Sequence, residues 1–212
     1  MNDPLFYKTP LITAIHSLRK DLIAEGGPQI STMRNYRFAI LPYDPRQEFE
    51  LRSHIRKLSD ELKGMGWNVL AISLKRILTN RLKVEDSRVF DGILRREYRL
   101  FQNSPQRALS YLKNKITAYI EEPDGIASAV IKLISEFADE HPDEAERTLI
   151  FIGRAGSLYP FFRSSALLKY IDGKTRNIPV VLLYPGERRD LSALSFMGEL
   201  DADRDYRPRI YS

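Results

Sequence analysis

The sequence predicts an α/β protein with a mostly parallel central sheet of about four to five strands, flanked by helices. Two apolar segments lead to this prediction: residues 148–152 and 179–184 are β-branched and aliphatic without polar alternation, as in strands buried on both faces. The roughly 25 residues between them are long enough for a crossover helix. Together they predict a parallel βαβ unit. The alternation of strand and helix patterns along the rest of the chain places further parallel strands beside this unit.

The other elements follow from the same two periodicities and from Gly and Pro breaks. In chain order they are a helix over 10–22 that ends at Gly26-Gly27-Pro28, a strand over 37–41, a helix over 51–62, a strand over 67–72, helical segments over 74–122 with breaks at Ser87, Ser104-Pro105 and Pro123, a helix over 125–140, and an edge strand within 206–211. Pro208 favours an edge position because a central strand needs every amide as a donor.

A length of 212 residues fits a single α/β domain. Within it, residues 74–122 form a helical insertion and residues 147–212 a C-terminal strand-turn-helix-strand region. The chain has 43% hydrophobic and 29% charged residues, and no apolar run approaches the ~20 residues of a membrane span. Because the N-terminus lacks the order of a secretory signal, we expect a cytoplasmic protein that does not bind membranes. The absence of cysteine excludes disulfides and thiolate catalysis but is neutral about the compartment.

The segment most suited to bind an anion is the predicted strand-to-helix turn at 153–157. Its glycines can expose backbone N–H groups beside Arg154 and Ser157 at the carboxyl end of a parallel strand. The alternative is a tight turn in which Ser157 forms a local cap. Gly173-Lys174-Thr175 does not continue a P-loop, because Leu168 stands where a glycine is required. Gly173 is instead predicted to form a helix C-cap.

No combination of residues predicts catalysis. Ser157 lacks the flanking glycines of a hydrolase elbow, and the histidines lie on separate predicted helices without the spacing of metal ligands. We therefore expect no enzymatic activity, no catalytic residues, no metal and no cofactor.

The net charge of +5 is a weak indication of an anionic partner, since 28 acidic residues are mixed among 33 basic ones. Basic side chains concentrate in the helical insertion and could contact nucleic acid there: Arg76, Arg81, Arg88, Arg95 and Arg96. Interleaved acidic residues such as Asp91 and Glu97 favour a solvated, salt-bridged face instead. Direct DNA binding is accordingly expected to be weak.

Several motifs of the C-terminal region resemble the BrxB family of bacteriophage-exclusion (BREX) defence systems. They are Gly156-Ser-Leu-Tyr-Pro-Phe161 with Arg163, Leu167-Leu168, the segment 179–186, Phe196-Met-Gly198, and Tyr206-Arg207. Family-motif residues that could mediate interaction are Arg154, Gly156, Ser157, Tyr159, Pro160, Phe161, Arg163, Tyr184, Pro185, Gly186, Tyr206 and Arg207. Tyr159, Phe161 and Phe162 could form a stacking platform, but Phe161 and Phe162 at the start of a predicted helix are expected to anchor it against the sheet instead. Tyr184-Pro185-Gly186 is predicted to form a turn after a buried strand, with a positive φ at Gly186 as one reason for glycine.

The resemblance implies a cytoplasmic component of a multi-protein antiviral system for which no enzymatic activity is established. It implies other BREX proteins as partners, most plausibly the alkaline-phosphatase-like PglZ protein. The leading hypothesis is a non-catalytic accessory or scaffold subunit. The alternative is a nucleic-acid- or nucleotide-sensing module that uses the basic helical region and the glycine-rich turn at the strand end.

Overall fold

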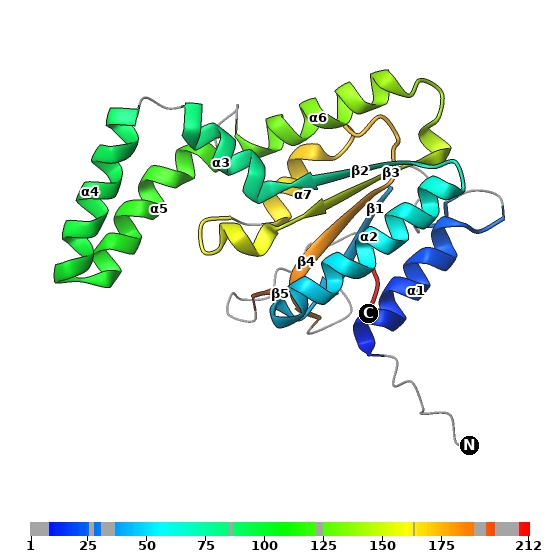
Figure 1. Ribbon diagram of the computed structural model, residues 1–212, viewed down its shortest axis with the longest axis horizontal. Coiled ribbons are helices and arrows are strands. Elements are labelled where there is room, and N and C mark those ends of the chain that lie inside the picture. The colour runs from blue at the N-terminus through cyan, green and yellow to red at the C-terminus, as the bar shows by residue number, and fades with distance from the viewer. Residues whose placement is uncertain are drawn as a thin grey trace, which may run out of the picture.

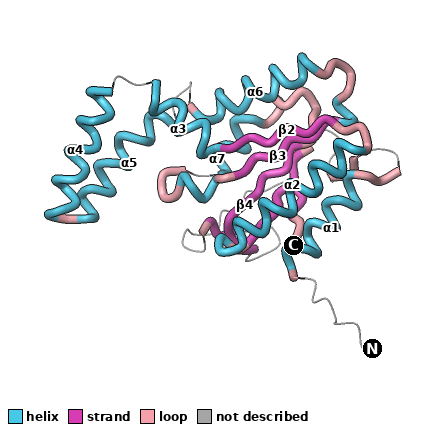
Figure 2. Tube along the Cα trace, in the orientation of Figure 1, coloured by secondary structure: helices cyan, strands magenta, loops and turns pink. Residues whose placement is uncertain are grey.

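The computed structural model is an α/β sandwich in which one sheet lies between two layers of helices (Figures 1 and 2). It describes residues 9–25, 28–30, 37–84, 87–121, 125–162, 164–188, 194–197 and 208–212. The predicted fold class is therefore confirmed. Among the described residues, no helix is both long and apolar enough to span a membrane.

The elements follow the predicted order closely, with most helices ending where a Gly or Pro was read as a break. The helices are α1 (Pro10–Leu22), α2 (Glu48–Gly64), α3 (Leu74–Val84), α4 (Ser87–Asn103), α5 (Pro105–Glu121), α6 (Ile126–Glu140) and α7 (Ser164–Ile171). The strands are β1 (Phe38–Tyr43), β2 (Asn68–Ser73), β3 (Thr148–Gly153), β4 (Val180–Arg188), β5 (Leu194–Phe196) and β6 (Arg209–Ile210). Short 3-10 helices cover Pro45–Gln47, Ala145–Arg147 and Ala155–Leu158.

The described strands form one six-stranded sheet in the order β2-β3-β4-β1-β6, with β5 paired to β4. All pairs on the main path are parallel, whereas β5 runs antiparallel to the end of β4. The chain passes from β1 to the edge strand β2 and then returns inward through β3 to β4. The predicted C-terminal edge strand is present at 209–210, directly after Pro208.

Alternate residues of each central strand supply two separate cores. On one face, Ala39, Phe151 and Leu183 pack against α1 and α2. On the other face, Ile40, Ile152 and Leu182 pack against α6, α7 and part of α3. These side chains are buried on both faces, which explains why the strands show no polar alternation.

Helices α4 and α5 form a hairpin that extends away from the sheet (Figure 1). This hairpin, residues 87–121, joins α3 to α6 and occupies most of the predicted insertion. The C-terminal part of α5 returns to the core through Ile120, which is buried. The rest of the hairpin is supported mainly by contact between its own two helices.

The predicted turn at Tyr184-Pro185-Gly186 is wrong. Strand β4 continues through these residues to Arg188, because β5, which the sequence did not predict, pairs with its end. Gly186 lies opposite Phe196 in that pairing and is not among the residues with positive φ. Glycine is needed there for space, since a Cβ at Gly186 would lie 2.1 Å from the Ser195 carbonyl oxygen.

Candidate functional site at the carboxyl edge of the sheet

The ends of two strands, β1 and β3, bring a hydrogen-bonded set of polar side chains to one edge of the sheet. Arg154 follows β3 in the left-handed conformation (φ 66°), and its Nη1 donates a hydrogen bond to Glu48 Oε1 over 2.9 Å. Glu48 begins α2, and its other oxygen accepts a hydrogen bond from the hydroxyl of Tyr43 at the end of β1. Residues separated by 106 positions in the chain therefore meet because β1 and β3 both flank β4.

Tyr43 and Arg154 each donate a hydrogen bond to Glu48. Burial, followed by the hydrogen bond to Glu48, raises the pKa of Tyr43 above its ordinary value, so its hydroxyl stays protonated and donates. The side chains of Arg154 and Glu48 are 27% and 22% exposed, which leaves their ion pair partly shielded from water. Arg154 thus binds a carboxylate of its own chain, and an incoming anion would have to compete with Glu48.

The predicted turn at 153–157 is a 3-10 helix. The N–H of Ser157 donates to the Arg154 carbonyl over 3.2 Å, and the N–H of Tyr159 donates to the Gly156 carbonyl over 3.2 Å. Ser157 itself is exposed. The Ser157 and Tyr159 donors are therefore used within the turn, which agrees with the alternative of a tight turn.

The family-motif residues gather around β5. A Cβ at Gly156 would lie 3.2 Å from Met197 Sδ and 3.3 Å from Pro185 Cγ, so the 3-10 helix packs closely on the end of β4. Phe196 contacts Tyr184 edge-on at 5.4 Å between ring centroids, and Tyr159 at 6.3 Å.

The hydroxyl of Tyr184, a fully buried residue, donates to the Leu194 carbonyl over 3.2 Å. Pro160 and Phe161 follow Tyr159 with intermediate exposure, and the Tyr159–Pro160 peptide bond is cis. The side chains of Tyr159 and Tyr184 therefore pack on β5. Arg163, Tyr206 and Arg207 lie outside the described residues.

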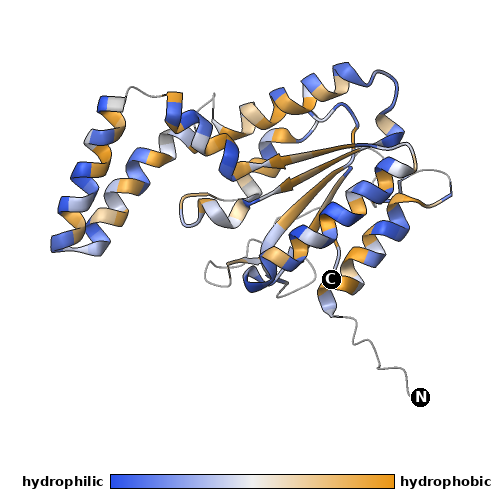
Figure 3. Cartoon of the chain, in the orientation of Figure 1, coloured by the Kyte–Doolittle hydropathy of each residue, from blue (hydrophilic) through white to orange (hydrophobic). Residues whose placement is uncertain are grey.

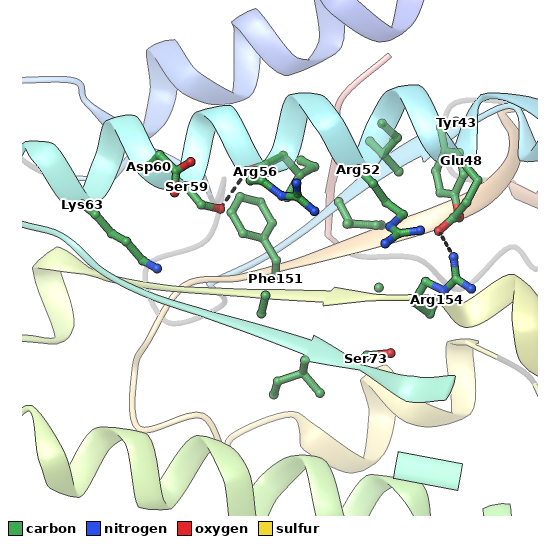
Figure 4. A pocket seen from close by; sticks show the side chains of 16 residues that line it. Tyr43, Glu48, Arg52, Arg56, Ser59, Asp60, Lys63, Ser73, Phe151 and Arg154 are labelled. Atoms are coloured by element: carbon green, nitrogen blue, oxygen red, sulfur yellow. Dashed lines mark hydrogen bonds and ion pairs between the residues drawn. The ribbon is translucent and has the colours of Figure 1, made fainter. Parts of the chain in front are cut away.

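A groove of about 320 Å³ runs between α2 and the strands β2 and β3 (Figure 4). Phe151, Ala71 and Ile55 contribute to its apolar floor. Its flank on α2 is polar and mostly basic, with Arg52, Arg56, Ser59, Asp60 and Lys63. The Arg154–Glu48 pair closes its end at the carboxyl edge of the sheet (Figure 4).

Sequence analysis identified Arg154 but missed the rest of this groove. The available signal was the spacing of Arg52, Arg56 and Lys63, which places them on one side of a single helix. That spacing alone does not reveal the groove, because the position of β2 at the sheet edge follows only from the strand order.

The predicted basic residues are spread over α3 and α4 and do not converge on one site. Arg81 Nη1 reaches the Gly125 carbonyl at 3.5 Å, and the Arg96 guanidinium lies over the Tyr111 ring at 5.4 Å. Arg95 donates to the Asp91 carbonyl one turn earlier at 3.4 Å. Arg76 and Arg88 are exposed on their helices.

The hairpin also carries apolar residues, which are the orange segments of α4 and α5 in Figure 3. On α4, Leu94, Tyr98 and Phe101 are 46%, 64% and 51% exposed. Their spacing of four and three residues places them along one side of the helix. We call these three residues the hairpin stripe.

Comparison with known proteins gives one consistent result. The family model described as "BREX protein BrxB" matches residues 70–210, about two thirds of the chain. A relative from Bacillus cereus (strain H3081.97), also named "BREX protein BrxB", is 24% identical over 181 residues, which cover 80% of this chain and 80% of the relative. No solved structure matches the chain.

Proposed function

This chain belongs to the BrxB family of BREX phage-defence proteins, and on that premise we propose that it is a non-catalytic docking subunit of a BREX system. The partner that we expect is another BREX protein, most plausibly the PglZ-like protein. A cytoplasmic location fits this role.

The observation that supports docking most directly is the hairpin stripe. Leu94, Tyr98 and Phe101 lie about half or more in solvent on a hairpin that stands away from the sheet. Contiguous exposed apolar side chains on a soluble protein usually mark a binding surface. Tyrosine and phenylalanine are also enriched in the cores of protein interfaces.

The carboxyl edge of the sheet, where open α/β folds usually bind ligands, supports a non-catalytic role. There the ionisable side chains of Arg154, Glu48 and Tyr43 are engaged with one another. These contacts hold the loops after β1 and β3 together and stabilise the scaffold that carries the hairpin.

The test is co-expression of the chain with the PglZ-like protein and the other proteins of its BREX system, followed by affinity capture and size-exclusion chromatography after nuclease treatment. We expect a nuclease-resistant stoichiometric complex. The double variant Tyr98→Ser/Phe101→Ser should weaken it at least about thirty-fold, since a central aromatic residue contributes about 2 kcal/mol or more to such interfaces. The control Met65→Ser/Tyr170→Ser removes apolar side chains that are similarly exposed, 46% and 56%, outside the hairpin.

A complex that is lost equally in both variants would place the interface elsewhere. A chain that elutes alone and retains DNA only at low salt would favour the nucleic-acid module. In that case Arg95→Glu/Arg96→Glu should abolish DNA binding, because both side chains are exposed on α4 and would no longer attract phosphates.

A further inference from the structure

We propose that the groove between α2 and β2 binds an acidic amphipathic helix of a partner protein. This inference rests on the docking role proposed above and adds a second surface, separate from the hairpin stripe. The uncovered face of β2, the cations of α2 and the shape of the groove support it.

The helical layer formed by α1 and α2 leaves the edge strand β2 partly bare. In β2, Ile72 points to the opposite layer and is buried, whereas its neighbour Ala71 faces the groove and is exposed. Phe151, the residue of β3 that pairs with Ala71, is by contrast only 1% exposed. A sheet of this kind usually has helices over both faces of its strands, so the groove lies where a further helix would complete the layer.

Three of the cations along the groove form no ion pair with a carboxylate among the described residues. Arg19, Arg154 and Arg209 each form an ion pair within the structure. Within the described part of the chain, Arg52, Arg56 and Lys63 form none, although all three line the groove. The Arg52 guanidinium lies over the Phe49 ring, 5.9 Å from its centroid. Three cations in a row beside an apolar floor complement carboxylates on one flank of an amphipathic segment.

The shape of the groove favours a helix. Its lining on α2 extends from Glu48 to Lys63, or about 22 Å at 1.5 Å per residue. The small residues Ala71, Ser73 and Gly153 on the strand side permit close approach of a backbone. Nucleic acid fits less well, because the aromatic ring on the floor, Phe151, is too buried to stack with a base.

The test places a photo-crosslinking residue, p-benzoylphenylalanine, at Ala71 and at the control position Lys57, which is exposed on α2 outside the groove. Each protein is co-expressed with the proteins of its BREX system, irradiated and analysed by mass spectrometry. We expect crosslinks from position 71 to an acidic helical segment of a partner and none from position 57. A complex that forms without a crosslink at 71, or a crosslink from 71 to nucleic acid, overturns this inference and leaves the docking role intact.

Charge reversal gives a second measurement. Arg52→Glu/Arg56→Glu/Lys63→Glu should weaken the complex about tenfold or more. Binding is measured well below the melting temperature of the variant, because the new carboxylates lie one turn from Glu48 and Asp60 on α2 and lower its stability. The control Lys20→Glu/Lys57→Glu/Lys169→Glu changes net charge equally at exposed positions outside the groove. Equal weakening by both variants would refute the inference, and failure of the unmodified chain to form any complex would refute both proposals.

Discussion

Replacing Gly186 with alanine should destabilise the protein by crowding the contact between β4 and β5. The added Cβ would lie 2.1 Å from the Ser195 carbonyl oxygen and 2.7 Å from Tyr184 Cε1. Neither neighbour can move freely, because Ser195 belongs to the paired strand β5 and Tyr184 is 1% exposed. Strand β5 must therefore shift away from β4.

The cost follows from the contacts that such a shift disturbs. Overpacking of this kind costs about 1–3 kcal/mol, and loss of the hydrogen bond from Tyr184 to the Leu194 carbonyl costs about 1 kcal/mol more. We expect the free energy of unfolding to fall by about 2–4 kcal/mol. For a chain of this size that lowers the melting temperature by about 5–15 °C.

Urea unfolding followed by circular dichroism measures this effect, with Gly92→Ala as the matched control. Gly92 lies inside α4, and a Cβ there would meet no atom within 4 Å. Its replacement should stabilise the protein by about 0.5–1 kcal/mol through helix propensity. If Gly186→Ala left the urea midpoint unchanged, the close packing of β5 on β4 would be wrong.

Two further predictions concern the polar side chains at the strand ends. Glu48→Gln removes the charge that pairs with Arg154 and should lower the free energy of unfolding by about 1 kcal/mol, whereas Glu50→Gln at an exposed position of the same helix should change it by less than about 0.5 kcal/mol. Equal urea midpoints for the two variants would contradict a stabilising role of the pair. The raised pKa of Tyr43 predicts a stability contribution that is fully present below its unfolded value of 10.0 and is lost as the pH rises above it. The free energy of unfolding, measured with urea at about pH 8.5 and pH 10.5, should therefore fall less in Tyr43→Phe than in the parent chain. An identical fall in both proteins would argue against the buried hydrogen bond.

The sequence predicted those parts of the fold that local signals determine. Pro105 begins α5, and Gly173, with φ 70°, follows the end of α7 as expected of a C-terminal cap. The central strands were predicted because burial on both faces leaves an unbroken apolar run. Such signals depend on residues close in the chain and need no knowledge of the tertiary fold.

The candidate site could not be predicted in the same way. The partner of Arg154 is Glu48, and their meeting depends on the order of β1, β4 and β3 in the sheet. Strand β5 is only three residues long and forms because its residues cover Tyr184 and Gly186. Proline and glycine in β4 indicated a turn on local grounds, but pairing with β5 outweighs that preference.

The two proposed surfaces differ in a physical property that separates them experimentally. The groove beside α2 attracts its partner through Arg52, Arg56 and Lys63, so its contribution to affinity should weaken as salt screens the charges. The hairpin stripe contributes through Tyr98 and Phe101, whose burial depends little on ionic strength. A complex that uses both surfaces should therefore keep its salt dependence when the stripe is removed and lose much of it when the groove cations are reversed. The salt dependence of the two variants, more than their affinities, identifies which surface each partner contacts.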